Sequence, residues 1–561
     1  VFGSPNNVTT VSYGSETQAT LLNETGEQLQ YTMQPGLYRR VTSIQSAGQS
    51  GQDGSEYNTS GQLIRSTDRR GIVTEYGYTG AHRTSVTLAV GTNEQRSEEF
   101  DHDPVTGLVT EQRVKDRTGA LVAQSQWTYN SRGQVASSRM LDPATGASRS
   151  AFIRYCEASD VSAGTCPMVG LTIAVDGPRI GTADTTHFTY RMADDAGCAT
   201  SPTACAYRKG DLWKTTNALG QTAEVLRHDG MGRVQSIRDI NGVQTDIEYD
   251  PHGRVLTRKV RGADNEVESD DQVTRIAYNA VGAVQEVRLP DGVITRYEYD
   301  AVQRLTGIVD SNDNRMRFVL NAAGERVRED VQDASGSLLR TLSRTYDMLG
   351  NLHQQLDAQN HASTFLYDAE DNLTLETDRL GRKTRHEYDA LGRLRNTLQD
   401  VDGVAASTQF QYDAQDRVTQ VLDPNGLPTS YQYNGFGDLV RQESPDTGVA
   451  TTTYDEAGNL KTRTDARGIT ATYGYDVLNR ITSVAYPDNS RNTGFVYDTS
   501  PAECPAIERF HLGRLARMND ASGSTLYCYD RFGYLTRSLQ STQGRTFVLA
   551  YQRAYPGAVG N

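Results

Sequence analysis

The sequence has 561 residues, a formal net charge of −14 and 36% apolar side chains, with 51 glycines and 30 tyrosines. Nucleic-acid binding needs Lys and Arg clustered on one face, and a membrane-spanning helix needs about 18 consecutive apolar residues; the sequence contains neither. The tyrosines and the regularly spaced Val, Leu and Ile argue against a disordered chain.

Residues 1–150 are predicted to form divergent β-repeats. An aromatic residue followed by a turn-like phrase recurs in them, as YNTSGQL from Tyr57, FDHDPVTGLV from Phe100 and YNSRGQV from Tyr129. The chain begins with Val1 and shows no signal-peptide pattern at its start. We therefore expect it to be a processed or excised piece of a longer protein.

Residues 151–212 interrupt this repeat and carry four of the six cysteines. We predict that this segment is an insertion at the surface. No CxxC pair occurs, which argues against zinc or redox chemistry. Close spacing predicts disulfides between sequence neighbours and an oxidising compartment, with free buried thiols as the alternative. The candidates are Cys156 with Cys166, Cys198 with Cys205, and Cys504 with Cys528.

Residues 213–561 repeat most regularly. The phrase YDALGRL from Tyr388 returns as YDPHGRV from Tyr249, YDMLGNL from Tyr346 and YDEAGNL from Tyr454. Its tyrosines fall 21 residues apart from 346 to 388 and again from 412 to 475. A phrase repeated at a fixed period describes a building unit, whereas a catalytic motif is needed once. The predicted signature residues are Tyr249, Asp250, Gly253, Arg254, Tyr346, Asp347, Gly350, Tyr388, Asp389, Gly392, Arg393, Leu394, Tyr454, Asp455 and Gly458.

Each unit of about 21 residues is predicted to be a β-hairpin. Asp at the first position of a turn and Gly at the fourth favour a type I turn with a bulge. A second turn of this kind, such as Asp378 to Gly381, precedes each tyrosine. Segments such as TQFQYD (408–413) place a second aromatic two residues before that tyrosine, on the same face of a strand. Stacked hairpins therefore predict an aromatic ladder along one face of an all-β sheet.

The expected sheet is too long to stay flat. About forty strands at about 4.8 Å each would extend roughly 190 Å, and sheets much beyond about ten strands curl or split. Curled into a single ring, such a sheet would be about 60 Å across, too wide for side chains to fill. The low apolar fraction favours a wet interior, so we predict a spiral strip that encloses space.

The phrase Tyr-Asp-x-x-Gly-Arg-Leu at about 21-residue spacing resembles the YD repeat of the RHS-repeat proteins, a family that includes bacterial polymorphic toxins, the C subunit of insecticidal toxin complexes and the animal teneurins. The resemblance is strong from about 217 to 551 and weaker before 150. It implies a hollow, cocoon-like shell wound from β-hairpins. It also implies that, in a bacterial member, the shell would enclose a toxic C-terminal domain until delivery.

The sequence contains few motifs for catalysis or metal binding. The resemblance implies paired DPxGL motifs for self-cleavage, but a single match, Asp423 to Leu427, lies in an ordinary second turn, and Asp103 to Leu108 is one residue too long. No GxSxG, HExxH or GxxxxGK[ST] motif occurs. A metal at His353, Asp357 and His361, or Ca²⁺ at 310–314 or 264–271, is less favoured than ordinary turns. We predict no enzyme activity, cofactor or metal.

Two functions remain open at this point. The chain is expected to be a non-catalytic shell that encapsulates a toxin or effector polypeptide for secretion. The alternative is an extracellular adhesion or structural module without cargo, which self-associates through exposed hairpin edges. The expected partners are the enclosed polypeptide or the rest of a larger chain, with no nucleic acid and no membrane span. The expected location is secreted or at the cell surface, in a bacterium.

Overall fold

The structure is a computed structural model that describes residues 9–23, 27–35, 39–46, 51–181, 184–201, 205–264 and 267–551. These residues form one sheet of 45 strands with few helical turns. The first strands are β1 (Thr10–Ser15), β2 (Gln18–Leu22), β3 (Gln28–Met33), β4 (Val41–Ser46), β5 (Asp53–Tyr57), β6 (Leu63–Thr67), β7 (Val73–Thr79), β8 (His82–Leu88), β9 (Arg96–His102), β10 (Val109–Lys115), β11 (Leu121–Tyr129), β12 (Val135–Leu141), β13 (Ser148–Tyr155), β14 (Thr172–Asp176), β15 (Thr186–Tyr190), β16 (Leu212–Thr216), β17 (Thr222–His228), β18 (Val234–Arg238), β19 (Gln244–Tyr249), β20 (Val255–Val260), β21 (Gln272–Tyr278) and β22 (Val284–Arg288).

The remaining strands are β23 (Ile294–Tyr299), β24 (Leu305–Val309), β25 (Arg315–Leu320), β26 (Arg326–Gln332), β27 (Leu338–Tyr346), β28 (Leu352–Leu356), β29 (Ala362–Tyr367), β30 (Leu373–Thr377), β31 (Lys383–Tyr388), β32 (Leu394–Gln399), β33 (Ala406–Tyr412), β34 (Val418–Leu422), β35 (Pro428–Tyr433), β36 (Leu439–Ser444), β37 (Gly448–Tyr454), β38 (Leu460–Thr464), β39 (Thr470–Tyr475), β40 (Ile481–Ala485), β41 (Thr493–Tyr497), β42 (Leu515–Asp520), β43 (Gly523–Tyr529), β44 (Leu535–Thr542) and β45 (Arg545–Ala550). The short helices are α1 (Ala158–Ser162), η1 (Ala196–Ala199), η2 (Glu268–Asp270), η3 (Asn489–Arg491) and η4 (Ala506–Glu508). No helix among the described residues is long and apolar enough to cross a membrane.

The strands form a meander, because each pairs antiparallel with its neighbours in the chain, from β1 with β2 to β44 with β45. The hairpin prediction is therefore confirmed. The register shifts by one residue at the signature tyrosine, as at Tyr388, which lies opposite Leu394 while Glu387 lies opposite Asn396. Such a bulge increases the local twist of a strand, and its recurrence in nearly every hairpin curves the whole sheet.

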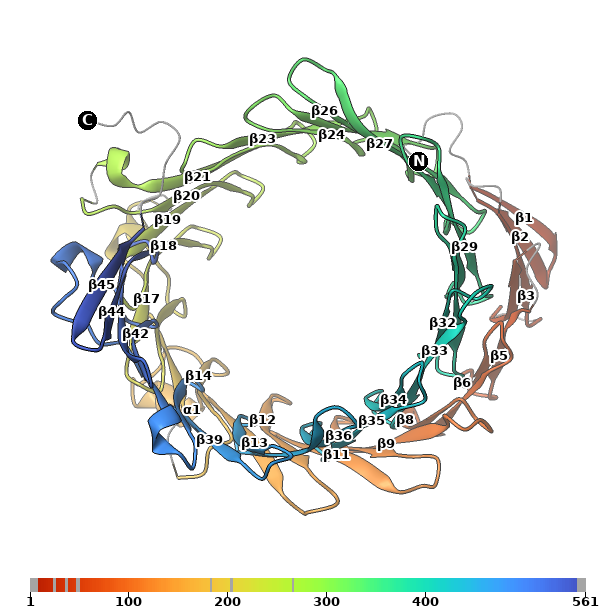
Figure 1. The fold of residues 1–561 in the computed structure, drawn as a ribbon, viewed down its shortest axis with the longest axis horizontal. Coiled ribbons are helices and arrows are strands. Elements are labelled where there is room, and N and C mark those ends of the chain that lie inside the picture. Colours follow the sequence, from red (N-terminus) through yellow and green to blue (C-terminus); the bar gives the residue numbers. More distant parts are fainter. Residues whose placement is uncertain are drawn as a thin grey trace.

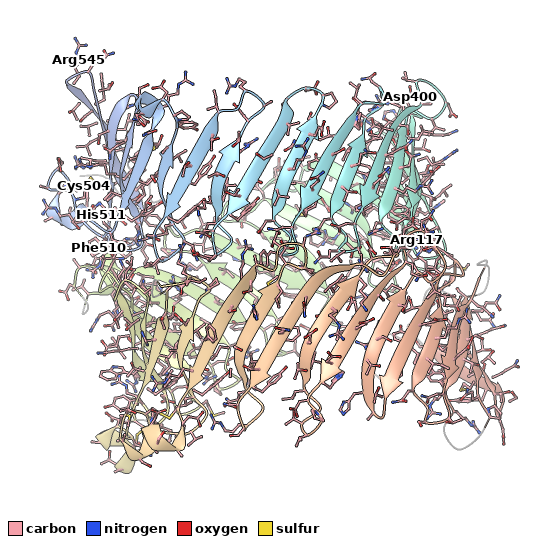
Figure 2. All side chains as sticks on the ribbon, turned by 90° about the horizontal axis from the view of Figure 1, so that it is seen from below. Arg117, Asp400, Cys504, Phe510, His511 and Arg545 are labelled. Atoms are coloured by element: carbon pink, nitrogen blue, oxygen red, sulfur yellow. A yellow bond between two sulfur atoms is a disulfide. The ribbon has the colours of Figure 1, made fainter. Side chains whose placement is uncertain are left out.

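The sheet winds around an open centre in two stacked coils, as Figure 1 shows down the axis and Figure 2 from the side. The turn after β6 contacts the turn after β31 through Arg70 and Asp389, and the turn after β18 contacts the loop after β41 through Asn241 and Leu512. One coil thus takes 25 strands when counted from β6 to β31, and 23 strands when counted from β18 to β41. At about 4.8 Å per strand a coil is roughly 115 Å around and 37 Å across before strand tilt widens it. The spiral prediction is confirmed, but the width of a single ring, about 60 Å, is wrong because the strip passes round almost twice.

The described residues form no thick hydrophobic core. Its accessible surface is 31675 Å², whereas a compact protein of 61.7 kDa exposes about 20,000 Å². The apolar side chains that are fully buried are few and scattered, and three of the most deeply buried are the cysteines Cys156, Cys504 and Cys528. A wall one sheet thick, with solvent on both faces, accounts for this excess of surface.

The aromatic ladder faces the enclosed space. Figures 1 and 2 show the loop that carries Cys504 outside the wall, and this cysteine is bonded to Cys528 of β43. The side chain of Cys528 therefore points outward, and its neighbours Tyr527 and Tyr529 point inward. Side chains converge on the concave face of a curved sheet, which agrees with the lower exposure of Tyr388 and His386 than of Glu387 between them.

Residues 151–212 contribute to four of these strands, to β14 and β15 in full, to β13 in part and to β16 with its first residue alone. Two loops leave the sheet in this range, one containing α1 and the other η1, and each carries a pair of cysteines. What the sequence suggests as one insertion is thus two loops separated by regular strands. The division of the chain into three parts stays a prediction.

Candidate functional site

The signature aspartate organises each hairpin turn. In the turn from Tyr388 to Leu394, Oδ1 of Asp389 accepts hydrogen bonds from the N–H groups of Leu391 (2.9 Å) and Arg393 (3.0 Å). Gly392 has a φ of 76° and donates its N–H to the Asp389 carbonyl (3.0 Å). One carboxylate oxygen therefore satisfies two donors that the turn would otherwise leave unpaired.

The signature arginine ties one unit to the next. Nε of Arg393 donates to Oδ2 of Asp389 at 2.8 Å, and Nη1 reaches the carbonyl of Asp413 in the following turn at 3.0 Å. The guanidinium carbon lies 4.7 Å from the ring centre of Tyr412, the tyrosine of that following unit. The same stacking recurs for Arg233 on Tyr249 (4.7 Å), Arg254 on Tyr278 (4.6 Å), Arg417 on Tyr433 (4.7 Å) and Arg480 on Tyr497 (4.5 Å).

The signature tyrosine ties each unit to the previous one. The hydroxyl of Tyr388 donates to the carbonyl of Leu373 at 2.9 Å, which is the carbonyl at the Leu position of the preceding unit. The same bond is made to the preceding unit by the hydroxyls of Tyr249 (2.8 Å), Tyr346 (3.1 Å) and Tyr454 (2.9 Å). Tyrosine and arginine thus link neighbouring hairpins in both directions, which explains why the phrase must recur.

The other predicted signature residues lie at the equivalent places. Asp250 accepts from the N–H of Arg254 at 2.9 Å, Asp347 accepts from Leu349 and Asn351 at 2.9 Å, and Asp455 accepts from Asn459 at 2.8 Å. The glycines have positive φ: Gly253 88°, Gly350 86° and Gly458 85°. All of these residues support the wall, and the structure does not gather them into a single pocket.

The looser copies replace the glycine with a side chain that makes an additional contact. Asp371, Asp416 and Asn479 occupy the glycine position at φ values of 62°, 63° and 62°. Each accepts a hydrogen bond from the arginine or asparagine at the signature arginine position of the preceding unit. The donors are Asn351 (2.8 Å), Arg393 (2.9 Å) and Asn459 (2.9 Å). The cost of the left-handed conformation is small for Asp and Asn, and the bond between units offsets it.

The three disulfides all belong to signature turns that are split by longer loops. Tyr497 and Asp498 are followed, after residues 499–512, by Gly513, Arg514 and Leu515, and Tyr497 still pairs with Leu515. Residues 157–169 split the turn between Tyr155 and Thr172 in the same way, and residues 192–209 split that between Tyr190 and Leu212. The bonds join Cys156 to Cys166, Cys198 to Cys205, and Cys504 to Cys528, the pairs of sequence neighbours predicted.

The seam between the coils joins two different kinds of turn. Second turns of the first coil meet signature turns of the second coil, and arginines of the first coil make most of the contacts. Arg149 shows the chemistry most fully: its Nη2 lies 2.6 Å from Oδ2 of Asp438, and its guanidinium lies 4.3 Å from the ring centre of Phe436. Further bonds are Arg70 Nη1 to the Asp389 carbonyl (3.1 Å), Arg96 Nη1 to Asp416 Oδ2 (2.7 Å), Arg179 Nη1 to Asp455 Oδ2 (3.4 Å) and Tyr534 Oη to Gln272 Oε1 (3.1 Å).

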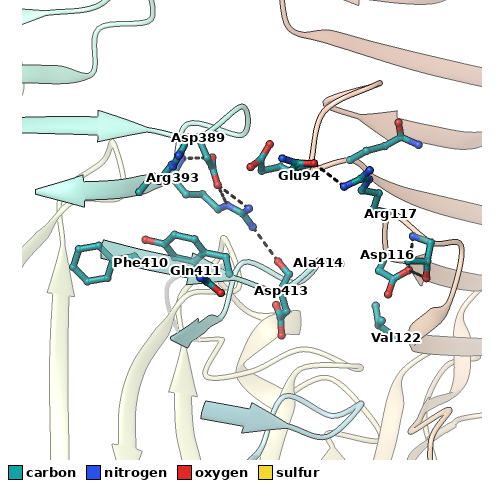
Figure 3. Close-up of a pocket in the computed structure, with 15 residues that line it drawn as sticks. Glu94, Asp116, Arg117, Val122, Asp389, Arg393, Phe410, Gln411, Asp413 and Ala414 are labelled. Carbon is teal, nitrogen blue, oxygen red and sulfur yellow. Dashed lines mark hydrogen bonds and ion pairs between the residues drawn. The ribbon is translucent and has the colours of Figure 1, made fainter. Parts of the chain in front are cut away.

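A cavity of about 410 Å³ interrupts this seam between the turn at Asp116 and the strands around Tyr412. Figure 3 shows Arg117 and Glu94 of the first coil facing Arg393 and Asp413 of the second across it. Arg117 is bonded within its own coil, from Nη1 to Asn93 Oδ1 at 2.6 Å. Charged side chains of both signs line the cavity. This mixture is more typical of a gap in the seam that water can fill than of a site for one ligand.

The motifs that could have carried other chemistry lie in ordinary turns. Oδ1 of Asp423 accepts from the N–H groups of Asn425 (2.9 Å) and Leu427 (2.7 Å), as in any second turn. His361 bonds Asp357 within one turn, from Nδ1 to Oδ2 at 3.1 Å, and Asp310 is likewise engaged by the backbone of its own turn. The run 264–271 lies partly outside the described residues. Among the described residues, no three His, Cys, Asp or Glu side chains are placed to hold a metal ion.

Comparison with known proteins places the repeat in a family. A family model described as Teneurin YD-shell matches residues 322–542, and one described as RHS Repeat matches residues 57–92 and 278–315. The chain is 28% identical over 181 residues to the double-stranded DNA deaminase toxin A of Burkholderia cenocepacia (strain H111), which covers 32% of this chain and 11% of that protein.

Among solved structures, the fold is similar to that of TcdB2-TccC3-TEV, with a TM-score of 0.51, 13% identity, and coverage of 94% of this chain and 32% of that one. TcdB2-TccC3-Cdc42 matches with a TM-score of 0.47, 13% identity, and coverage of 97% and 31%. The chain therefore spans about a third of the solved structures' chains and about a tenth of the curated relative.

Proposed function

Because this chain belongs to the RHS- and YD-repeat proteins, we propose that it forms the wall of a hollow shell that encloses a toxin or effector polypeptide. The observation that carries this proposal is the excess of accessible surface over a compact protein of the same mass. A sheet that keeps solvent on both faces along 45 strands gains nothing in stability from being hollow. A requirement for enclosed space explains that architecture.

The dimensions suit such a role. A coil about 37 Å across leaves a passage of roughly 25 Å after side chains are allowed for, and an α-helix with its side chains is about 10–12 Å wide. An unfolded or partly helical polypeptide would fit. In this proposal the wall acts by containment and contributes no catalytic residue.

The disulfides support a secreted protein. Three bonds join all six cysteines, and disulfides persist in oxidising compartments. The similarity of one segment to a deaminase toxin favours a toxin as the enclosed polypeptide, and a bacterial source is part of the same proposal. An adhesion or structural module without cargo is the competing outcome of the experiment below.

Limited proteolysis of the protein at the length at which its source makes it tests this proposal. We expect a polypeptide distinct from residues 1–561 to survive protease while the shell is folded and to be degraded once the shell is denatured, as followed by intact-mass measurement. The control is the same sample denatured before the protease is added. If every polypeptide other than the wall is degraded at the rate of that control, or if none is present, containment is wrong and the adhesion module stands.

A further inference from the structure

One unit of the wall departs from the repeat pattern at several places. Leu320 stands where the signature tyrosine belongs, Glu325 replaces the signature arginine, and Arg326 replaces the leucine that follows it. In the next unit Arg344 stands two residues before Tyr346, where most units have an aromatic residue. These changes bring arginines into the inward face of β26 and β27.

The change at Leu320 also removes the ring on which the preceding arginine would stack. Arg304 is the signature arginine of the preceding unit, and no ring lies at its stacking position. Its Nε is paired with Oδ2 of Asp300 at 2.7 Å, and its Nη1 bonds the carbonyl of Asn321 at 3.1 Å. Arg304 lines a cavity of about 470 Å³ together with Arg326, Arg344, Leu320 and Tyr346.

The arginines around this cavity and their carboxylate partners form a patch in which guanidinium groups outnumber carboxylates. Arg326, Arg340 and Arg344 share Glu329, with nitrogen to oxygen distances of 3.3, 2.8 and 3.7 Å. Glu329 is buried, with 9% of its side chain exposed. With Arg304 and its partner Asp300 included, the patch contains four guanidinium groups and two carboxylates, a net charge of +2, because three of the arginines share the single carboxylate of Glu329.

One nitrogen of the patch lacks any partner. Nη1 of Arg344 is buried and has no hydrogen-bond partner among the described residues. A buried guanidinium nitrogen in that state costs free energy unless an acceptor reaches it. Planar guanidinium groups pair best with carboxylate and phosphate oxygens, and Arg344 lines the cavity itself.

We propose that this cavity is a binding site for an oxyanion, a carboxylate or phosphate group, held by Arg344 and Arg326 with Arg304 at its edge. Because Arg344 and Tyr346 share the inward face of β27, the site opens toward the enclosed space. Leu320 and Tyr346 supply an apolar side to the cavity, so the ligand is a charged group carried on a larger molecule. The site is independent of whether the shell holds cargo.

Calorimetric titration of the full chain at low ionic strength tests the site, with inorganic phosphate and triglutamate as separate probes. We expect saturable binding of at least one probe, weakened at least tenfold by Arg344→Gln and by Arg326→Gln. Binding of phosphate alone indicates a phosphate group as the ligand, and binding of triglutamate alone indicates a carboxylate. The control is Arg385→Gln, which changes an exposed arginine on the outward face of β31 and should leave affinity unchanged.

Thermal melting of each variant separates loss of the site from loss of the fold. If Arg344→Gln does not fold, Arg326→Gln, whose side chain is 40% exposed, still decides the question. The absence of saturable binding to the unchanged chain overturns the proposal. Equal weakening by Arg385→Gln overturns it as well, because the affinity would then reflect general charge.

Discussion

The regular signature turns of the second coil and the three split turns reach the same hairpin geometry by different means. In the turn at Tyr388, Asp389 and Arg393 close the loop with a carboxylate, a guanidinium and backbone N–H groups. In the turn at Tyr155, Cys156 stands at the aspartate position, and its N–H donates to the Leu171 carbonyl at 2.8 Å across a much longer loop.

The difference shows what the signature contributes. A short turn of three residues between Asp389 and Arg393 is fixed by local polar contacts that cost little chain entropy to form. A loop of thirteen or more residues loses more entropy on closure, and a disulfide removes part of that loss from the unfolded state. The wall thus keeps its strand register at Tyr155, Tyr190 and Tyr497, although the three loops that split these turns differ in length.

Acid should break the second turns of the regular repeat before the split turns, with the largest effect because many turns respond at once. The backbone N–H of His361 lowers the pKa of Asp357, and the Arg467 side chain lowers the pKa of Asp465, both from an ordinary value of 3.8. A lowered carboxylate pKa stabilises the fold above the unfolded value, and that stability is lost as pH falls below about 3.8.

Hydrogen–deuterium exchange pulses after incubation at decreasing pH will measure this order. We expect the turns at residues 357–361 and 465–469 to lose protection before the disulfide-closed turn at 155–172. Simultaneous loss in both regions would show that the two kinds of turn do not differ in this way.

Removal of one disulfide should have the next largest effect. Cys504→Ser with Cys528→Ser opens a bridge that spans 24 residues, and we expect a loss of about 2–4 kcal/mol from the apparent stability. Urea denaturation will measure it, with exchange to show whether protection is lost at 498–512 and at Asn241 across the seam. A uniform loss along the array would contradict a local role.

Removal of a signature carboxylate tests how much its local polar contacts stabilise a regular signature turn. Asp389→Ala leaves two N–H groups without their acceptor and Arg393 without its ion pair, and we expect a loss of about 1–3 kcal/mol. Asp402→Ala is the matched control, because its carboxylate is 67% exposed and pairs with Lys383 alone. Equal effects of the two in urea denaturation would refute the role given to the signature.

Substitutions at the glycine position of the signature should change stability differently in regular copies and in looser ones. Gly392→Ala forces a residue with a β-carbon to a φ of 76°, and we expect a loss of about 1 kcal/mol. Asp371→Gly relieves the same conformation but removes the hydrogen bond from Asn351, so we expect a change near zero. Thermal melting of both variants measures the difference, and a large loss from Asp371→Gly would show that the bond between units dominates.

Removal of a single hydroxyl should have the smallest effect. Tyr388→Phe removes the bond to the Leu373 carbonyl, and we expect a loss of about 0.5–1.5 kcal/mol. Tyr431→Phe is the control, since it lies two residues before Tyr433 on the same inward face and has no described hydroxyl bond. A loss of equal size in the control would mean that the hydroxyl of the signature tyrosine has no special role.

Local chemistry made the hairpins predictable from the sequence. The Asp and Gly spacing around Tyr388 specifies a turn without reference to distant residues, and close cysteine spacing predicted the three disulfides that the structure confirms. The split turn at Tyr497 was missed, although Asp498 before the loop and Gly513-Arg514-Leu515 after it spell the signature in two pieces. A search that allowed a gap within the phrase would have found it.

The seam could not be predicted in the same way. Arg149 and Asp438 are 289 residues apart, and their contact depends on how many strands make one coil. That number follows from small increments of twist accumulated over more than twenty strands, which no single residue reveals. The arginine patch around Glu329 was missed for a related reason, because its members come from two strands, β26 and β27, and from the turn that carries Arg304.

In this structure one sheet passes around an open centre almost twice. Electron cryomicroscopy of the purified chain tests that arrangement most directly. We expect a wall one sheet thick in two stacked coils, with an open interior and the turn of Arg149 against that of Asp438 at the seam. A filled interior, or a single wide ring in which these two turns do not meet, would contradict it.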